Sequence, residues 1–258
     1  MFSPALTGNL DNTRVATRLG SKMIDGMNML NLLLPGTAFT YYGEEIGMED
    51  YRGGKLVEYP QRTPFLWNNS TNAGFSTNTS TLQINENFLE VNLQKQNETA
   101  KSHYNVYKKI AAIRKKLQEE DTSFTHFKED GIFVFIRILS TNEYYIVAVN
   151  FGETDETIDL QDECEKLPDI LEVYTSSIDS EKVEGENFTS NKIVLAGKEA
   201  VVFTGRLQPT TTTTTTTKTT TAESCACTES PGKGSQAYGG IFILLATSGL
   251  ALSVQSAI

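Results

Sequence analysis

A run of threonine near the C-terminus limits how much of this chain can form a packed core. Residues 209–221 are almost pure threonine, and such a segment lacks the apolar side chains that build a core. We expect an extended, O-glycosylated stalk there. The folded part of the 258-residue chain therefore ends near Arg206, which leaves room for one large domain or two modest ones.

The N-terminal part has the pattern of a parallel α/β unit. Apolar residues recur at helical spacing over residues 13–34, with Asp11 or Asn12 as a suitable N-cap and a Pro-Gly pair at 35–36 as the stop. Residues 37–42 then read as a short buried strand. The order strand end, helix, strand predicts the βαβ unit of a parallel sheet or barrel.

After residue 120 the apolar pattern changes its period. A long polar loop region over 43–81 and a second amphipathic helix over 99–117 come before this change. The short apolar or alternating runs that follow predict an antiparallel β-domain of about 80 residues. These runs are 124–126, 131–138, 144–151, 156–160, 171–174, 192–195 and 200–204.

Charge and cysteine content exclude some classes of function. The formal net charge of −10 disfavours nucleic-acid binding, because phosphates need clustered Lys and Arg. An acidic chain of this kind is compatible with neutral substrates such as sugars. The three cysteines, Cys164, Cys225 and Cys227, fit no four-ligand zinc pattern. We also find no clustered oxygen-ligand loop for Ca²⁺, so no metal site is expected.

Asparagine sequons indicate a secreted protein. Each Asn-x-Ser/Thr tripeptide without proline is a candidate N-glycosylation site. Such tripeptides begin at Asn68, Asn69, Asn78, Asn97 and Asn187. Because Asn68 and Asn69 are adjacent, we expect glycosylation of only one of them and take the sites as Asn68, Asn78, Asn97 and Asn187.

The C-terminal tail has the features of a glycosylphosphatidylinositol (GPI) attachment signal. Small residues and a polar spacer precede an apolar stretch over about 238–254, which has no Lys or Arg after it. Ser224, Cys225 and Gly232 are candidate attachment residues. A transmembrane end and an inert hydrophobic tail are the alternatives. With GPI attachment, the tail is removed and the protein is anchored to the membrane from outside.

Four segments, in order along the chain, carry a family resemblance. They are Gly8-Asn9-Leu10-Asp11-Asn12-Thr13-Arg14, residues 34–48 with Tyr41-Tyr42-Gly43-Glu44-Glu45, residues 61–67 with Arg62-Thr63-Pro64-Phe65, and a helix with Tyr104, Tyr107 and Arg114. Together they resemble insect maltase-type α-glucosidases of the α-amylase family, over about residues 7–206. The resemblance implies the C-terminal part of a TIM-type (β/α)8 barrel followed by an antiparallel β-sandwich domain.

We therefore expect four parts in the chain. Residues 1–120 are the end of the catalytic barrel and residues 121–207 the β-domain. Residues 208–237 form the threonine-rich stalk and spacer, and residues 238–258 the hydrophobic C-terminal signal. The start of the chain has neither a basic residue nor a long apolar stretch and so is no signal peptide. The sequons, the stalk and the GPI signal nevertheless indicate a secreted protein. We therefore expect a truncated sequence.

The resemblance also implies a reaction and its residues. Family members hydrolyse the terminal α-glucosyl bond of maltose or sucrose with retention, using a nucleophile, a general acid and a third carboxylate. By resemblance Asp11 is the third carboxylate, which steadies the transition state, and Arg62 lies near the substrate. The nucleophile and the acid would lie upstream and are not assigned in these residues. No organic cofactor is implied.

Position 10 departs from the family pattern. The family carries a histidine there that hydrogen-bonds a substrate hydroxyl, whereas this chain has Leu10. A buried hydroxyl without its partner costs about 1–3 kcal/mol. Glu44 and Glu45, adjacent at a strand end, are expected to face opposite sides and to shape the pocket wall rather than to form an acid–nucleophile pair.

Three functions remain open. The first is a GPI-anchored α-glucosidase at the outer face of the plasma membrane, on gut epithelium by resemblance. The second is a non-catalytic surface glycoprotein that binds partners through its β-domain and stalk. The third is a silent relative, such as the ectodomain of an amino-acid-transporter heavy chain, which the C-terminal signal disfavours. Linkage preference, oligomeric state and surface partners do not follow from the sequence.

Overall fold

The computed structural model describes residues 5–53, 58–78, 80–118, 121–128, 131–163 and 167–207, with two further pairs at 242–243 and 254–255. Those pairs form the short antiparallel strands β11 (Phe242–Ile243) and β12 (Val254–Gln255). The expected stalk and the GPI candidates Ser224, Cys225 and Gly232 lie outside the described residues. Within the described part, no helix is long and apolar enough to cross a membrane.

The βαβ prediction for the N-terminal part is confirmed. Strands β1 (Ala5–Leu6) and β2 (Ala38–Phe39) run parallel, with Ala5 opposite Ala38. Helices α1 (Val15–Leu19) and α2 (Ile24–Leu33) form the connection between them. The second strand was expected over 37–42, but regular pairing covers only two residues.

The single helix expected over 13–34 is wrong, because it is broken at Gly20. There the backbone turns to φ +82°, a conformation that only glycine adopts without strain. A 3-10 turn, η1 (Ser21–Met23), then leads into α2. The expected N-cap is also wrong: Arg14 occupies that position of α1, without a side-chain cap.

Two arginines hold the C-terminal end of α2. The guanidinium of Arg114 donates to the carbonyl oxygens of Leu32 and Leu34, at 3.2 and 3.3 Å, and also to that of Gly36. Buried Arg137 donates to the carbonyl oxygen of Leu33 at 3.0 Å. These carbonyls have no partner inside the helix, so cationic donors at this end satisfy them.

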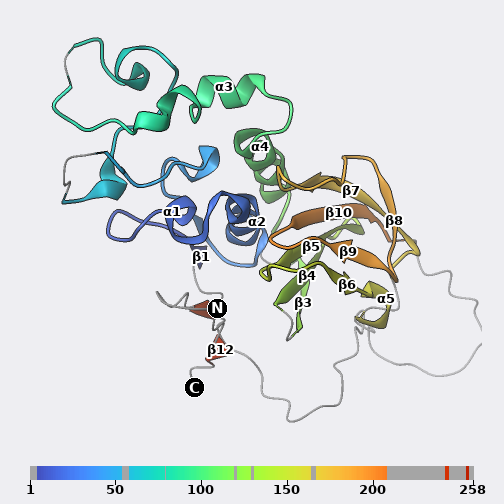
Figure 1. Cartoon of the computed structure of the whole chain (residues 1–258). Coiled ribbons are helices and arrows are strands. Elements are labelled where there is room, and N and C mark those ends of the chain that lie inside the picture. The colour runs from blue at the N-terminus through green and yellow to red at the C-terminus, as the bar shows by residue number, and fades with distance from the viewer. Residues whose placement is uncertain are drawn as a thin grey trace, which may run out of the picture.

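The segment after β2 is made of turns rather than a featureless loop. It contains the 3-10 turns η2 (Glu44–Ile46), η3 (Pro60–Arg62), η4 (Thr71–Gly74) and η5 (Glu86–Leu89), and helix α3 (Leu93–Glu98). A small core of Ile46, Met48, Leu66 and Ala73 holds it together. Most of this segment lies on the far side of the helices from the large sheet (Figure 1).

The second amphipathic helix is shorter than expected. Helix α4 (His103–Arg114) begins after Ser102, whose hydroxyl accepts a hydrogen bond from the backbone N–H of Asn105 at 3.3 Å. This is the usual chemistry of a serine N-cap. His103 is buried and its Nδ1 lies 2.8 Å from Oδ1 of Asp25 on α2, so this histidine joins α4 to α2.

Each apolar run expected in the second half lies in or overlaps a strand. The strands are β3 (Thr122–Lys128), β4 (Ile132–Ile138), β5 (Glu143–Asn150), β6 (Glu156–Ile158), β7 (Ile170–Ser176), β9 (Ile193–Leu195) and β10 (Ala200–Arg206). Two elements have no expected counterpart: strand β8 (Asn187–Thr189) and the short helix α5 (Leu160–Glu163).

These strands form one large sheet and one small one. Six antiparallel strands follow the order β3-β4-β5-β10-β7-β8, and β6 pairs only with β9. The domain is antiparallel as expected. Its second layer is a two-stranded sheet, so the arrangement is an unequal pair of layers rather than two sheets of similar size.

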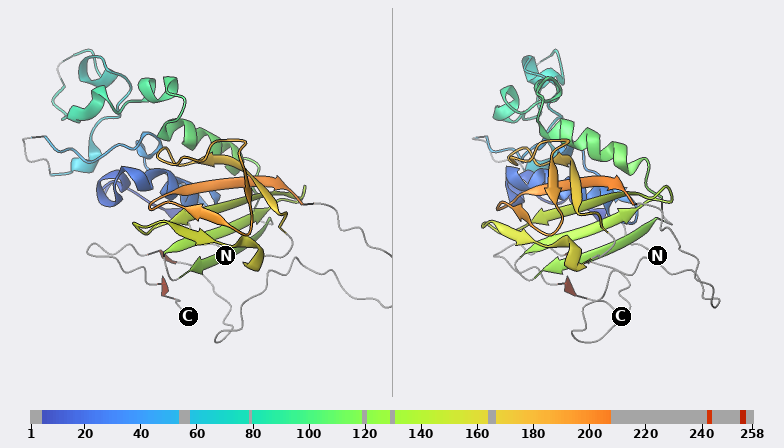
Figure 2. Two further views of the ribbon diagram at one scale, coloured as in Figure 1. Left: turned by 45° about the vertical axis from the view of Figure 1, so that its right-hand side comes forward. Right: turned by 90° about the vertical axis from the view of Figure 1, so that its right-hand side faces the viewer.

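The large sheet is buried on both faces. Val147 and Val149 of β5 pack with α2 and α4, whereas Ile146 and Ala148 pack with residues of β6 and β9. Helices α2 and α4 lie on one side of the sheet (Figures 1 and 2). The border expected at residue 120 thus crosses a continuous core, and the division into domains stays a prediction.

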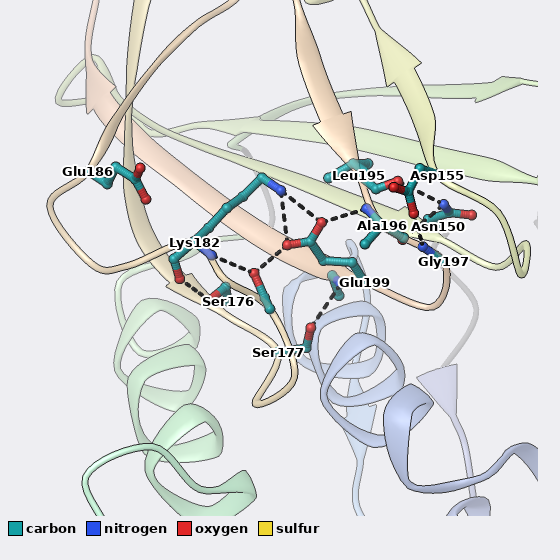
Figure 3. A network of polar contacts seen from close by, with 12 residues as sticks. Asn150, Asp155, Ser176, Ser177, Lys182, Glu186, Leu195, Ala196, Gly197 and Glu199 are labelled. Atoms are coloured by element: carbon teal, nitrogen blue, oxygen red, sulfur yellow. Dashed lines mark hydrogen bonds and ion pairs between the residues drawn. The ribbon is translucent and has the colours of Figure 1, made fainter.

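A buried polar network lies where the sheet meets the helices (Figure 3). The carboxylate of Glu199, just before β10, accepts hydrogen bonds from Nζ of Lys182 at 2.8 and 2.9 Å and from the backbone N–H of Ala196 at 2.8 Å. The hydroxyl of Ser180 also donates to it. The network therefore joins the loop after β7 to the loop before β10.

Candidate functional site

The loop after β1 presents Asp11 at the surface. Oδ1 of Asn9 accepts hydrogen bonds from the backbone N–H groups of Asp11 and Asn12, at 2.8 and 2.9 Å. An asparagine that binds the backbone two and three residues on stabilises a tight turn. The turn leaves the Asp11 side chain 74% exposed. Asp11 is thus not a helix cap, which was the alternative interpretation of this residue.

Arg62 reaches Asp11 from the turn η3. Its NH2 group lies 3.1 Å from Oδ1 of Asp11, and its Nε donates to the carbonyl oxygen of Leu10 at 2.9 Å. The guanidinium also lies over the ring of Tyr59, 4.0 Å from its centroid. The fold therefore brings together the two residues that the sequence selected, although 51 positions separate them.

Gln61 provides a second contact between the two loops. Its Nε2 donates to the carbonyl oxygen of Leu10 at 2.5 Å, so this oxygen accepts from two consecutive side chains. Gln61 itself is buried, and its own carbonyl oxygen accepts from the hydroxyl of Tyr41 at 3.4 Å. These contacts hold the backbone immediately before Asp11.

Buried Glu44 lies beneath the start of the Asp11 loop. Its Oε1 accepts from the hydroxyl of Thr7 at 3.1 Å and its Oε2 from the backbone N–H of Tyr41 at 3.1 Å. A Cβ at Gly8 would overlap Oε1 of Glu44, so only glycine permits this approach. Burial raises the pKa of Glu44 to about 7, although the two hydrogen bonds and Arg14 oppose the shift.

Glu44 and Glu45 lie in the 3-10 turn η2, not on the extended strand that the sequence suggested. Oε2 of Glu45 accepts from the backbone N–H of Gly43 at 2.7 Å. Burial raises the pKa of Glu45 as well. Both carboxylates therefore bind backbone and neighbouring loops, which agrees with a role in the wall of the site.

Arg14 closes the other end of the Asp11 loop. It is 2% exposed, its NH1 donates to the carbonyl oxygen of Tyr42 at 2.6 Å, and its guanidinium lies under 5 Å from the ring centroids of Tyr41 and Tyr42. Its backbone N–H donates to Oδ1 of Asp50 at 2.9 Å. Within the described residues, its Nε and NH2 have no hydrogen-bond partner.

The surface around the Asp11–Arg62 pair is partly apolar. Leu10 is 49% exposed, and Tyr42 and Tyr59 are also exposed. Leu10 has no group that donates a hydrogen bond, whereas the pair itself can bind hydroxyl groups through one carboxylate and one guanidinium. Chemically, the site can orient a sugar and stabilise positive charge beside Asp11.

The expected modification sites differ in accessibility. Asn78, Asn97 and Asn187 are exposed. Asn68 is half-buried, and its Oδ1 accepts from the backbone N–H and the hydroxyl of Ser70, at 2.9 and 2.5 Å. In the described part of the chain, no three His, Cys, Asp or Glu side chains gather as metal ligands would.

Sequence reasoning missed the supporting residues of the site. Thr7, Gln61 and Arg14 received no role, and Glu44 was placed on a strand. Thr7 directly precedes the motif that holds Asp11, and Gln61 begins the motif that holds Arg62, which is the signal that could have identified them. Their partners lie 37 and 51 positions away, so the contacts themselves follow only from the fold.

Comparison with known proteins relates the residues of this site to a known family. Residues 1–121 match the family described as "Alpha amylase, catalytic domain". Maltase 1 of Drosophila virilis is 34% identical over 216 residues, which are 76% of this chain and 34% of that protein. The alpha-glucosidase of Culex pipiens is 29% identical over 202 residues, with 76% of this chain and 34% of that protein covered.

A relative named as a transporter chain is similar to this chain as well. The human amino acid transporter heavy chain SLC3A1 is 31% identical over 208 residues, covering 77% of this chain and 30% of that protein. The chain thus spans about a third of the length of the curated relatives it matches.

Solved structures share the fold. A MutB mutant from crystals soaked with trehalulose superimposes with a TM-score of 0.62 at 23% identity, covering 80% of this chain and 43% of that one. A MutB mutant in complex with the substrate sucrose gives a TM-score of 0.60 at 21% identity, covering 79% and 42%. The expected barrel-type fold of the N-terminal part is therefore confirmed. Residues 1–121 thus match the catalytic domain of the α-amylase family, and the chain is similar to about a third of an insect maltase-type α-glucosidase.

Proposed function

We propose that this polypeptide carries the third carboxylate of a retaining α-glucosidase that releases terminal glucose from maltose or sucrose. Asp11 stabilises the oxocarbenium-like transition state, and Arg62 orients Asp11 and binds sugar hydroxyls. The nucleophile and the general acid belong to the part of the catalytic barrel that precedes these residues in the family.

The observation that carries the proposal is the pairing of Asp11 with Arg62 beyond the end of β1. The carboxyl ends of parallel strands are where barrel enzymes place their catalytic groups. Asp11 is exposed and held by side chains on both sides, with Asn9 in its own loop and Arg62 opposite. A transition-state carboxylate needs this combination of access and fixed position.

Arg62 provides the first test. Arg62→Ala in the native protein should raise the KM for maltose by about tenfold, because a charged hydrogen bond to a substrate contributes about 1.5–3 kcal/mol. Arg52→Ala is the matched control, since Arg52 is more exposed and forms only a 3.7 Å pair with Glu49. Equal KM values for the two variants would contradict the role of Arg62.

A second function is favoured by two observations. Leu10 replaces a hydrogen-bonding residue of the family, and an amino-acid-transporter heavy chain is among the relatives. In this alternative the chain is part of a non-catalytic surface glycoprotein derived from the family. This alternative would be supported if the native protein, with its sugar-binding residues intact, hydrolysed neither maltose nor sucrose.

We also propose that the protein is N-glycosylated and attached by a GPI anchor to the outer face of the plasma membrane. The sequons at Asn78, Asn97 and Asn187 support glycosylation because these side chains are exposed. The support for the anchor is the small-residue, spacer and apolar-tail pattern alone. A phosphatidylinositol-specific phospholipase should release the protein from membranes; retention would contradict GPI attachment.

A further inference from the structure

Glu44 closes a ring of contacts that includes both halves of the candidate site. One carboxylate oxygen accepts from Thr7, at the start of the Asp11 loop, and the other from the backbone of Tyr41. The ring continues from Tyr41 to the carbonyl oxygen of Gln61, and from Gln61 to the carbonyl oxygen of Leu10. The backbone from Leu10 back to Thr7 completes it.

The position of Glu44 permits little adjustment of this ring. Glu44 is 5% exposed, and Nδ2 of Asn28 on α2 donates to the backbone carbonyl oxygen of Glu44 at 3.1 Å. Gly8 lies so close to Oε1 that no side chain would fit between them. A change at this carboxylate is therefore transmitted to the Asp11 loop instead of being absorbed by empty space.

We propose that Glu44 is a positioning residue for Asp11 and Arg62, and that the ionisation of its carboxylate sets how firmly the loop 7–11 is held. The expected effect of Glu44 on catalysis rests on the proposed function of this site, whereas its effect on the loop does not. The ionised carboxylate accepts from both Thr7 and Tyr41 in charge-assisted bonds, which are about twice as strong as neutral ones. The neutral acid must turn its own O–H towards Thr7 and reverse that bond.

Four charged or titratable residues of the described chain surround Glu44. Arg14 at the start of α1 and Glu45 in the same turn act on it in opposite directions. Tyr107 on α4 is coupled to it electrostatically, and Tyr41 provides its backbone donor. Because burial raises the pKa of Glu44 to about 7, the two states of the loop should interchange near neutral pH.

The test is a pH titration of the full chain by NMR, in a background where Asp11→Asn removes the carboxylate next to Leu10. Backbone amide signals of Leu10 and Arg62 should shift with a common midpoint near pH 7. Glu44→Gln should abolish this common transition. Thr7→Val should reduce the amplitude of the transition at the Leu10 amide at least twofold, while the Tyr41 amide signal still shows the transition.

Glu45→Gln is the matched control, because Glu45 is the adjacent carboxylate but binds the backbone of its own turn. It should keep the Leu10 transition and lower only its midpoint, because the negative charge of Glu45 raises the pKa of Glu44. Signals that do not titrate between pH 5 and 9, or that titrate alike with and without Glu44→Gln, would overturn the proposal.

Catalysis gives a separate readout. In the native protein, Glu44→Gln should lower kcat for maltose about three- to tenfold with little change in KM and should remove the acidic limb of the pH profile. Rescue of kcat by Glu44→Asp would contradict a role that depends on reach to both Thr7 and Tyr41. If Asp11→Asn does not affect turnover, the proposed function fails, whereas the loop titration still decides the role of Glu44.

Discussion

At the residue scale, the candidate site depends on which side chains can form hydrogen bonds. Leu10 lies beside Asp11 and is half-exposed, but it offers a sugar hydroxyl no partner. Leu10→His should therefore raise kcat/KM for maltose about tenfold or more, since an added hydrogen bond is worth about 1–3 kcal/mol. Leu10→Met controls for the change in shape. No gain over Leu10→Met would mean that the site uses Leu10 as it stands.

The buried pair of Lys182 and Glu199 gives a prediction about stability. Glu199→Ala leaves the Lys182 ammonium, 11% exposed, without its partner, which should reduce the free energy of unfolding by about 3–5 kcal/mol. Glu184→Ala removes an exposed pair with Lys109 and should cost less than about 1 kcal/mol. Denaturant titration of both variants measures the difference, and equal losses would contradict the importance of the network.

Glu44 also predicts a pH dependence of stability. Its pKa rises from 4.5 in the unfolded chain to about 7 in the folded one, so the folded state binds the proton more tightly. Protonated Glu44 therefore stabilises the folded state fully below pH 4.5. As the pH rises to 7, this contribution to the free energy of unfolding, about 3 kcal/mol, is lost. The difference in unfolding free energy between wild type and Glu44→Gln should show this fall; a pH-independent difference would contradict it.

The sequence identified the two polar ends of the site but not its support. Asp11 and Arg62 lie in motifs that a family resemblance can locate. The roles of Thr7, Gln61 and Glu44 depend on contacts between loops that are distant in the sequence. Nothing in local spacing indicates that a carboxylate after β2 lies beneath a glycine after β1.

At the element scale, Gly20 explains the main error in the helix prediction. The apolar spacing continues across Gly20, and a glycine inside a helix costs only about 1 kcal/mol, so periodicity alone predicts one helix. Gly20→Ala should destabilise the fold by about 1–3 kcal/mol through backbone strain alone, because no atom lies within 4 Å of the added Cβ. Exposed Ser21→Ala is the control, and equal melting temperatures would contradict the strain.

The positions of most strands were predicted from the sequence, but their order in the sheet was not. Runs such as 131–138 and 144–151 are apolar on both faces because the helices cover one face and the β6–β9 pair covers the other. Strand β8 was missed because only three residues pair there, and only Phe188 points to the core. The insertion of β10 between β5 and β7 follows from long-range pairing that no local pattern encodes.

At the scale of the whole molecule, the N-terminal unit and the β-domain are joined by one core. Side chains of α2 and α4 share it with β5 and β10, and Asp25 of α2 binds both His103 and the backbone N–H of Ile178. The position of β1 and β2, and therefore of the Asp11 loop, depends on this packing. The chain spans about a third of the length of its curated relatives.

The most direct test of the central proposal is the turnover of maltose by the native protein with and without Asp11. Asp11→Asn should lower kcat by about a hundredfold or more, the usual effect of removing one transition-state contact, while the melting temperature stays unchanged. Glu86→Gln makes the same chemical change at an exposed carboxylate of η5 and should retain full activity. Hydrolysis that is equally fast in both variants would contradict the assignment of Asp11.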